Sequence, residues 1–386
     1  YRMAGVTEEL KWNALFLSGG LAAVGQEIKS DFQKSESATL DIAVTGVSGS
    51  GKSSFINALR GVDNKNKYAA PTGPFETTMK PTRYSYPKKG TISVWDLPGI
   101  ATPTFQAKEY LETVNFHRFD FFIIVCGNRF TENDLLLARE IQKVKKCFYF
   151  IRSKIDQELD EDDEVSPNQI LVKIRNNCIE NLRKAGIETP KVFLVSTRWP
   201  NKFDFGELQE VLEGDLPDLK RLSFLLALPN ITSSIIEKKK VAMLDENWKI
   251  AILSAAVATV PIPGLSLACD IEQFVKRLAS FRLNLGLDED SLRRLAKTVG
   301  KTPKELRSVV KSTFGLEVSG DVVLKVLSKV AGGGLLLSTI VKQIPLAGQL
   351  GAAALSYVTS YRMLQTAVNE MGEDSKRVLE KAFPVD

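Results

Sequence analysis

The chain has 386 residues, of which 44% are hydrophobic and 25% charged, and its formal net charge is +5. These values exclude a disordered or fibrous protein, and the length predicts two domains, each with its own core. By count, all of the net charge lies in residues 223–386, where basic residues are spread rather than clustered. We therefore expect no nucleic-acid binding and only a weak attraction to anionic lipid.

The cysteines are widely separated in the sequence: Cys126, Cys147, Cys178 and Cys269. Because no C-x-x-C or histidine pair accompanies them, they predict neither disulfides nor zinc and favour a reducing, cytoplasmic setting. The apolar stretch 12–25 follows Glu8 and Glu9 instead of a basic cluster, so we do not expect a secretory signal.

Short apolar segments alternate with helical periodicity between residues 40 and 213. The segments that resemble strands are rich in β-branched and aromatic residues: 40–45, 91–95, 121–126, 147–152 and 192–196. Alternation of this kind predicts βαβ units. We expect an α/β domain with a mostly parallel sheet that helices cover on both faces.

After residue 222 the pattern becomes helical throughout. Two segments, 260–278 and 344–364, share Pro-x-x-Gly and predict a repeated helical hairpin. The uncharged stretch 250–269 has the length of a membrane span. Prolines in its middle favour a turn between two buried helices instead, and we interpret 344–361 in the same way.

The segment "GVSGSGKSS" follows the first strand and precedes a helical pattern. Gly46, Gly51, Lys52 and Ser53 fit the phosphate-binding pattern G-x-x-x-x-G-K-[ST]. Together with Gly49, the glycines let successive backbone amides point at phosphate oxygens, and the helix N-terminus adds a favourable dipole. We expect Lys52 to bridge the β- and γ-phosphates and Ser53 to hold Mg²⁺.

The segment "WDLPG" ends the second strand segment. Asp96 there is expected to contact Mg²⁺ through water, and the amide of Gly99 to contact the γ-phosphate. A switch threonine should precede Asp96, and "FETTMK" offers Thr77 and Thr78. We favour Thr78 as the ligand of Mg²⁺ and the γ-phosphate, although an ordinary edge-strand threonine explains either residue alone.

The segment "RSKID" follows the fourth strand segment and determines the base. The Asp156 carboxylate can accept both the N1 proton and the exocyclic amine of guanine, and adenine offers no such pair. Lys154 would lay its stem along the base or ribose. Ser153 stands where Asn or Thr is more usual, which we expect to weaken the loop. Ser196 and Thr197, after the last strand, would lie beneath the base.

Hydrolysis needs a group that orients the attacking water, often a glutamine soon after D-x-x-G. Ile100, Ala101 and Thr102 occupy these positions, and none can do so. The single histidine, His117, precedes a strand and is expected to pack or lie at the surface. We therefore expect slow turnover by the monomer unless a second molecule completes the site.

Several segments resemble the immunity-related GTPases, the interferon-inducible group that acts against intracellular pathogens. The resemblance covers roughly residues 38–300 and is carried by "TGVSGSGKSSFINALRGV", "WDLPGI", "RFTENDLLLAREI", "FYFIRSKID" and "LPNITSSIIEKKK". It implies a Ras-like P-loop G domain over 37–222. It also implies an all-α helical domain that joins the N-terminal segment 1–36 to 223–386.

The resemblance implies that the chain binds GTP and GDP with Mg²⁺, self-associates through the G domain, and loads peripherally onto vacuolar or other internal membranes. Related regulatory GTPases are implied partners. The functional positions that carry over are Gly46–Ser54 (Ser50 and Ser54 included), Thr78, Asp96–Gly99 and Ser153–Asp156. Of these, Lys52, Ser53 and Thr78 are the implied catalytic residues.

Two positions allow a closer comparison with this family. A regulatory branch has methionine in place of Lys52, so the chain resembles the effector branch. Several members carry glutamate where Val47 stands, which leaves any role of that glutamate open here. We consider two alternatives to an assembling GTPase: a slow GTP-dependent switch or scaffold, and a small-molecule phosphotransferase, for which the sequence shows no acceptor base.

Overall fold

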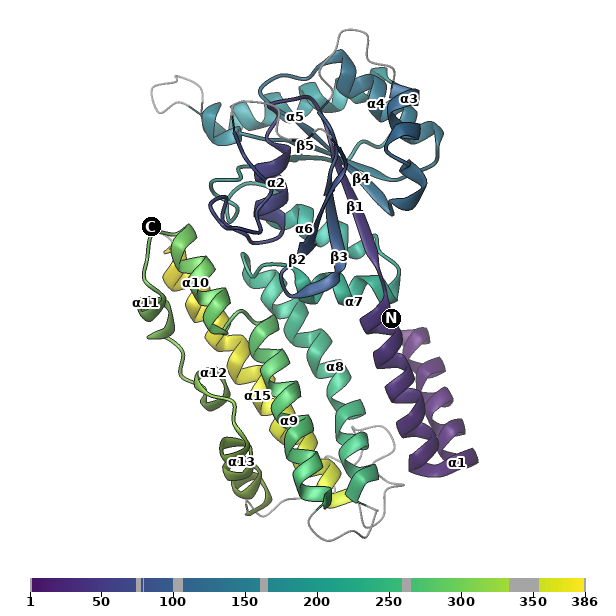
Figure 1. The fold of residues 1–386 in the computed structure, drawn as a ribbon, viewed down its shortest axis with the longest axis vertical. Coiled ribbons are helices and arrows are strands. Elements are labelled where there is room, and N and C mark those ends of the chain that lie inside the picture. Colours follow the sequence, from purple (N-terminus) through teal and green to yellow (C-terminus); the bar gives the residue numbers. More distant parts are fainter. Residues whose placement is uncertain are drawn as a thin grey trace. The chain divides into compact units, whose positions relative to one another are not determined.

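The computed structural model describes residues 2–73, 78, 80–99, 107–159, 166–258, 265–332 and 354–384. Contacts between residues divide the chain into two compact units. Residues 38–235 form one, the sheet unit, and residues 1–37 together with 236–386 form the other, the helical unit. The colours of Figure 1 show that both chain ends contribute to the helical unit.

The sheet unit contains one six-stranded sheet with the order β2-β3-β1-β4-β5-β6. Its strands are β1 (Leu40–Thr45), β2 (Thr82–Tyr86), β3 (Lys89–Asp96), β4 (Phe121–Cys126), β5 (Phe148–Arg152) and β6 (Val192–Leu194). All neighbouring pairs are parallel except β2 and β3. The mostly parallel α/β sheet predicted from the sequence is confirmed, with an antiparallel edge strand, β2, that the sequence analysis missed.

Helices and short 3₁₀ turns connect these strands. They are α2 (Lys52–Leu59), α3 (Ala107–Thr113), η1 (Phe116–Arg118), α4 (Glu132–Lys143), η2 (Ile155–Gln157), α5 (Pro167–Lys184), α6 (Phe205–Gly214) and α7 (Asp218–Ala227). Helix α3 packs against α4, α4 against β4 and β5, and α5 against β6. Helix α2 contacts β1 and β3, α6 contacts β6, and α7 contacts β3 (Figure 1).

The central strand β4 explains why both faces of the sheet need a cover. All six of its residues are buried. Phe122, Ile124 and Cys126 pack in a cluster with Leu137 of α4 and Leu182 of α5. Since side chains alternate along a strand, the other three residues of β4 face the opposite layer. A strand that is apolar throughout is typical of a parallel sheet buried on both sides.

The register of the sheet brings the functional loops to one edge. Val44 of β1 pairs with Asp96 of β3, and Cys126 of β4 pairs with Arg152 of β5. The carboxyl ends of β1, β3, β4 and β5 therefore lie side by side. The loops that follow these strands carry the phosphate-loop, D-x-x-G and K-x-D patterns found in the sequence.

The helical unit consists of long and short helices. They are α1 (Arg2–Ser37), α8 (Ser233–Ala258), α9 (Leu265–Asn284), α10 (Glu289–Thr298), α11 (Pro303–Arg307), α12 (Thr313–Leu316), α13 (Gly320–Gly332) and α15 (Ala354–Ala382). Helix α1 is interrupted at Gly20, whose φ of 62° is not helical. Its residues Trp12, Val24 and Ile28 share a buried cluster with α8 and α15.

The division between the units falls in the first turn of α8, later than the position after residue 222 chosen from the sequence. Helix α7 accounts for the difference. Its residue Phe224 lies fully buried and meets the ring of Tyr86 in β2 edge-on, with the centroids 6.0 Å apart. An aromatic pair of this kind ties the segment after 222 to the sheet.

The predicted hairpin turns at 261–264 and 345–348 lie outside the described residues. On either side of the first, α8 ends at Ala258 and α9 begins at Leu265. Within the described ranges, every helix is too short or too polar to cross a bilayer.

Candidate functional site

The loop between β1 and α2 takes a conformation that depends on glycine. Gly46, Gly49 and Gly51 have φ values of 140°, 77° and 94°, in the region that L residues rarely adopt. A Cβ atom on Gly46 would lie 2.1 Å from the Val125 carbonyl oxygen of β4. Gly51 forms the N-cap of α2 without a side-chain cap, so the first-turn amides of this helix are open to an anion.

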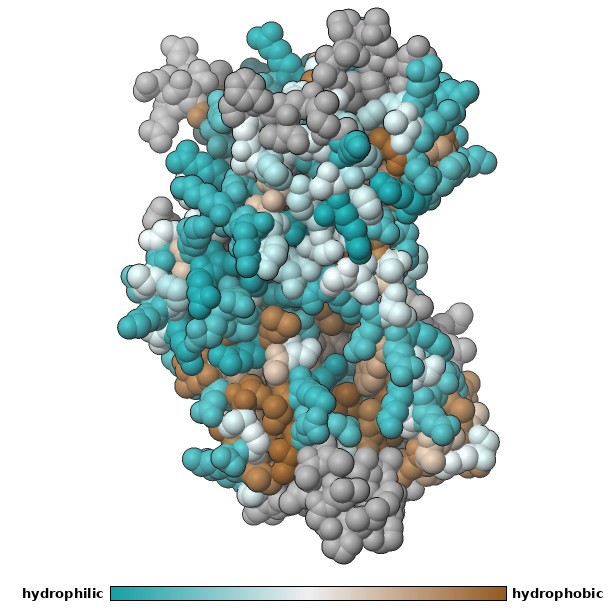
Figure 2. Space-filling view, viewed as in Figure 1, coloured by the Kyte–Doolittle hydropathy of each residue, from teal (hydrophilic) through white to brown (hydrophobic). Residues whose placement is uncertain are grey.

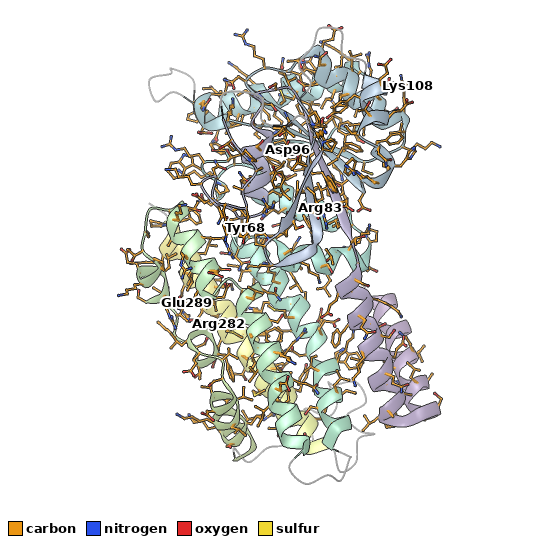
Figure 3. All side chains as sticks on the ribbon, in the orientation of Figure 1. Tyr68, Arg83, Asp96, Lys108, Arg282 and Glu289 are labelled. Atoms are coloured by element: carbon orange, nitrogen blue, oxygen red, sulfur yellow. The ribbon has the colours of Figure 1, made fainter. Side chains whose placement is uncertain are left out.

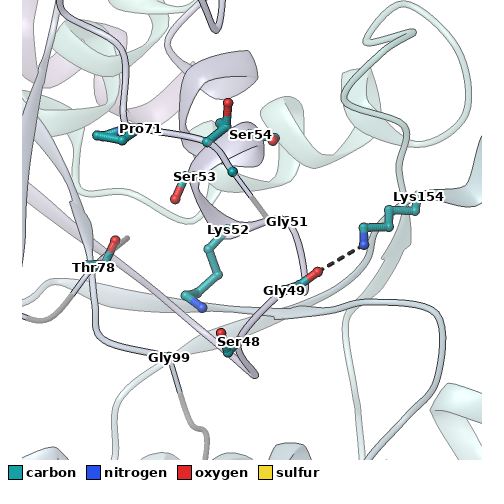
Figure 4. A pocket seen from close by; sticks show the side chains of 12 residues that line it. Ser48, Gly49, Gly51, Lys52, Ser53, Ser54, Pro71, Thr78, Gly99 and Lys154 are labelled. Atoms are coloured by element: carbon teal, nitrogen blue, oxygen red, sulfur yellow. Dashed lines mark hydrogen bonds between the residues drawn. The ribbon is translucent and has the colours of Figure 1, made fainter. Parts of the chain in front are cut away.

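Lys52 is the first residue of α2, and only 7% of its surface is exposed. Its Nζ atom donates to the carbonyl oxygens of Gly46 and Val47, each at 3.2 Å. The loop therefore wraps around the ammonium group. Figure 4 shows the side chain extending from the start of α2 toward Ser48, in the pocket that the loop borders.

A pocket lies against this loop, and Figure 4 shows its residues. Its lining consists of Ser48, Gly49, Gly51, Lys52, Ser53, Ser54, Pro71, Thr72, Gly73, Thr78, Gly99 and Lys154. Eight of these positions are among those that the sequence analysis selects for nucleotide binding. Ser48 falls within the range Gly46–Ser54 that the resemblance implies but was not selected individually. The segment Pro71–Gly73 was not selected, although Pro and Gly shortly before the switch threonine are a loop signal that could have identified it.

Asp96, at the end of β3, collects the hydroxyl groups expected to bind magnesium; Figure 3 labels it in the sheet unit. Its Oδ2 atom accepts hydrogen bonds from Ser53 Oγ at 2.8 Å and Thr78 Oγ1 at 2.9 Å. Its Oδ1 atom is buried with no hydrogen-bond partner among the described residues. Two hydroxyls and an unsatisfied carboxylate oxygen form a hard oxygen donor set, which fits Mg²⁺.

Burial controls the ionisation of Asp96. Desolvation raises the pKa of this carboxyl above its ordinary value of 3.8, while the hydroxyls of Ser53 and Thr78 and the charge of Lys52 oppose the shift. The hydrogen bonds and the positive charge around Asp96 therefore offset only part of the cost of burying its carboxylate. A divalent cation would supply the missing positive charge.

We expect Asp96→Asn to stabilise the nucleotide-free protein near neutral pH. Because the folded-state pKa of Asp96 is raised, its ionisation opposes folding, and this cost appears as the pH rises from about 4 through the shifted value. The gain in unfolding free energy of the variant over wild type should therefore grow with pH. Urea denaturation without nucleotide at several values between pH 4.5 and 7.5 measures it; a gain that shrinks as pH rises would contradict the assignment.

The turn that carries the K-x-D pattern contacts the phosphate loop directly. Lys154 has a φ of 58°, and its Nζ atom donates to the Gly49 carbonyl at 3.0 Å (Figure 4). Ser153 is buried, and its hydroxyl lies 2.6 Å from the carbonyl oxygen of Ser50 and 3.0 Å from that of Cys126, to either of which it can donate. The serine that replaces the more usual Asn or Thr thus joins the base turn to the phosphate loop.

The remaining base-binding positions lie outside the pocket lining. Asp156 is half-buried within η2. Ser196 is fully buried, and its hydroxyl accepts from the amides of Arg198 and Trp199 at 3.2 and 3.1 Å, while Thr197 is half-buried. The two base loops meet where the Ile155 amide donates to the Val195 carbonyl at 3.3 Å.

Some predicted positions lie elsewhere or outside the described residues. Thr77 and residues 100–102 are not described. His117 is exposed and stacks on Phe116, with the ring centroids 3.8 Å apart, in agreement with the surface position expected for it. Of the phosphate-loop positions predicted to contact nucleotide, Gly46 and Ser50 shape the loop but do not line the pocket.

Tyr110 of α3 was missed by the sequence analysis. Its hydroxyl donates to the Pro98 carbonyl at 3.0 Å and lies 2.9 Å from Thr45 Oγ1. The side chain therefore connects the root of the phosphate loop with the residue before Gly99. No local pattern marks this tyrosine, because its partners come from two other segments of the chain.

A glycine-dependent loop around a buried lysine, at the carboxyl edge of a parallel sheet, defines a P-loop nucleotide-binding protein. The sequence model of the interferon-inducible GTPase family matches residues 12–382. The chain belongs to this family, and it is therefore a GTP-binding immunity-related GTPase that hydrolyses GTP, as the resemblance implied.

Individual relatives cover most of the chain. Interferon-inducible GTPase 5 of Rattus norvegicus is 39% identical over 377 residues, which cover 96% of this chain and 81% of that protein. Interferon-gamma-inducible GTPase 10 of Mus musculus is 37% identical over 351 residues, or 90% and 82%. A solved structure of Toc33 from Arabidopsis thaliana with Mg²⁺ and GMPPNP aligns at 18% identity and a TM-score of 0.34, covering 46% of this chain and 79% of that one.

Proposed function

We propose that the chain binds Mg²⁺·GTP at the phosphate loop, assembles with other copies through the G domain while loaded with GTP, and disassembles on hydrolysis. The observation that carries this proposal is the convergence of Lys52, Ser53, Thr78 and Asp96, which come from three separate segments, around one loop. Such a convergence has no role in packing, since it concentrates polar groups where a core would hold apolar ones.

The phosphates would be held by backbone and by one cation. The amides of Gly49–Ser54 would donate to phosphate oxygens, the ammonium of Lys52 would reach the β- and γ-phosphates, and the Gly99 amide would contact the γ-phosphate. The hydrogen bonds of Lys52 to two loop carbonyls support this arrangement, because they hold the ammonium group inside the curve of the loop.

Ser53 and Thr78 would hold the magnesium ion directly, and Asp96 would hold it through water. The hydrogen bonds that both hydroxyls make to Asp96 support a common location for the three groups. Bound Mg²⁺ would neutralise charge on the β- and γ-phosphate oxygens. The chain itself would present the oxygens of Ser53, Thr78 and Asp96 in a buried setting. Contact between Thr78 and the γ-phosphate would be lost when GTP is hydrolysed.

Asp156 would select guanine over adenine by accepting two hydrogen bonds from the base. Lys154 would lie along the base or ribose, and Ser196 and Thr197 beneath the base. The half-buried position of Asp156 supports this role. When a base offers no donors, a partly desolvated carboxylate is left without hydrogen-bond partners, which costs binding free energy. The contact of Lys154 with Gly49 supports a continuous binding surface from phosphates to base.

Completion of the hydrolytic site would depend on assembly. The sequence provides Ile100, Ala101 and Thr102 where a water-orienting glutamine is common, and among the described residues the pocket lining contains no carboxylate or imidazole that could act in its place. A group from a second G domain, or one ordered by it, would then stabilise the transition state.

The helical unit would make peripheral contact with internal membranes, including pathogen vacuoles, from the cytoplasm, and related regulatory GTPases would control this step. In support, the helical unit exposes large apolar side chains, among them Leu10 at 62%, Leu17 at 82% and Val241 at 51%. Brown residues also gather on its surface in Figure 2. Residues 223–386 carry the net positive charge, which favours anionic lipid.

The test of assembly-dependent hydrolysis is the specific GTPase activity as a function of protein concentration. We expect the rate per molecule to rise at least about tenfold from dilute protein to the concentration at which light scattering detects assembly with GTP. GDP should give no scattering, and a non-hydrolysable analogue should give scattering that persists. A matched mixture with albumin controls for crowding.

The alternative function is a slow switch or scaffold in which nucleotide only sets conformation. The lack of a glutamine at positions 100–102, directly after D-x-x-G, favours it. A rate per molecule that stays flat and near zero across the same concentrations, with nucleotide still bound, would support this alternative over hydrolysis coupled to assembly.

A further inference from the structure

Arg152 is the last residue of β5 and directly precedes the base-binding turn. Only 4% of its surface is exposed, which is unusual for arginine. Its Nη2 atom donates to Glu158 Oε1 at 2.7 Å and to the Asn128 carbonyl oxygen. The buried guanidinium therefore contacts two segments at the carboxyl edge of the sheet: the one that follows β4, through Asn128, and the one that follows β5, through Glu158.

Glu158 is the C-cap of η2, the single 3₁₀ turn that contains Asp156. Within this turn the Gln157 amide donates to the Lys154 carbonyl at 3.0 Å, and the Glu158 amide donates to the Ile155 carbonyl at 3.1 Å. The turn has little internal support beyond these bonds. It also begins at Lys154, whose φ of 58° is rarely adopted by residues with a side chain, so outside contacts have to hold it.

The two ends of the turn are held by different groups. At the start, the buried hydroxyl of Ser153 contacts the carbonyls of Ser50 and Cys126. At the end, the carboxylate of Glu158 is held by the guanidinium of Arg152. Asp156 lies between these two attachments, and the position of its side chain therefore depends on both.

The second contact of Arg152 fixes its guanidinium relative to the phosphate loop. Asn128 follows Gly127, which packs closely on the phosphate loop: a Cβ atom on Gly127 would lie 3.3 Å from Ser50 Cα. By donating to the Asn128 carbonyl, Arg152 is anchored to a segment that is itself in contact with Ser50. The Arg152 side chain thus links the turn that carries Asp156 to a segment that packs against the phosphate loop.

We propose that Arg152 and Glu158 form a positioning pair. By fixing the turn that carries Asp156 relative to the phosphate loop, the pair sets selectivity for guanine. Neither side chain needs to contact the nucleotide. The proposal rests on the proposed role of Asp156 in reading the base. It explains why a charged pair is placed at this point of the fold, where the arginine is almost fully desolvated.

The test compares the affinities for GTP and for ITP, whose base lacks the exocyclic amine that Asp156 would read. Fluorescence titration with Mg²⁺ should give a ratio of dissociation constants, ITP over GTP, of about 10 or more in wild type. In Glu158→Ala the ratio should fall by about fivefold or more, because GTP loses a charge-assisted hydrogen bond that ITP never makes. Glu158→Gln, which keeps an acceptor for Arg152, should restore most of it.

Asp215→Asn is the matched control. Asp215, at the C-terminal end of α6, pairs with Lys191 and accepts from Tyr149 near the start of β5, so the variant also removes a charge pair that contacts this strand. Its ITP-to-GTP ratio should equal that of wild type. Thermal unfolding of every variant separates loss of stability, which weakens both nucleotides together, from loss of positioning, which weakens GTP more.

The outcomes separate this inference from the proposed function. If wild type prefers GTP and Asp156→Ala removes the preference, but Glu158→Ala keeps the wild-type ratio, Arg152 and Glu158 do not position the base turn. If wild type shows no preference for GTP over ITP, or Asp156→Ala keeps it, the role of Asp156 fails and the inference fails with it. Arg152→Met should reproduce the Glu158→Ala ratio; a wild-type ratio in that folded variant would also overturn the pairing.

Discussion

Lys52→Ala is expected to weaken GTP binding by at least about 100-fold, because several charge-assisted hydrogen bonds to phosphate oxygens are lost together. The effect should be large because the ammonium group is nearly buried and already sits within the loop that would surround the phosphates. Among the described residues of the pocket lining, the other cation is Lys154, and it donates to the Gly49 carbonyl at the base side. Isothermal titration of Mg²⁺·GTP measures the change.

Lys65→Ala is the matched control, since it removes an exposed lysine from the loop that follows α2. It should leave the dissociation constant within about twofold of wild type. The variant Lys52→Ala should remain folded, because it removes hydrogen bonds to two loop carbonyls without adding a clash or an unpaired charge. Retained GTP affinity in a folded Lys52→Ala protein would count against the site.

Gly46→Ala is expected to lower the free energy of unfolding by about 2–5 kcal/mol, since a positive φ costs about 1–2 kcal/mol and overpacking about 1–3 kcal/mol. The added methyl group would approach the Val125 carbonyl oxygen to 2.1 Å, and that oxygen belongs to the backbone of the central strand β4. Either the loop or the β1–β4 pair has to move. Because both alternatives disturb the phosphate loop, GTP affinity should fall in the same variant. Urea denaturation and nucleotide titration measure the two losses.

Gly49→Ala separates the backbone conformation from the steric clash. Gly49 also has a positive φ, 77°, but a Cβ atom there would meet nothing within 4 Å. Its replacement should cost only about 1 kcal/mol. A Gly46→Ala variant as stable as Gly49→Ala would mean that the close approach to Val125 does not constrain the loop.

The strands that the sequence predicts best are those whose burial is most uniform. Segments 40–45 and 121–126 coincide with β1 and β4, in which nearly every residue is buried and the apolar residues leave little choice of boundary. Strand β2 was missed because its residues are mostly exposed or half-buried and polar, as is typical of an antiparallel edge. Strand β6 is shorter than predicted, since Ser196 uses its hydroxyl to turn the chain.

In the candidate site, features that depend on residues close together in the sequence could be predicted, and contacts between separate segments could not. The phosphate loop could be predicted because its glycines and Lys52 follow one another along the chain. The hydrogen bond of Thr78 to Asp96 and the contacts of Tyr110 and Arg152 could not, since each depends on how separate strands and loops come together. The lining by Pro71–Gly73 belongs with these, because only the folded chain places that turn opposite the loop.

The most direct test of the central claim is calorimetric titration of the wild-type chain with GTP, and separately with ATP, in the presence of magnesium. The account predicts saturable binding of GTP at one site per chain, with ATP at least about tenfold weaker because Asp156 finds no matching pair of donors on adenine. Absence of binding at millimolar GTP with magnesium, or equal affinity for the two nucleotides, would contradict it.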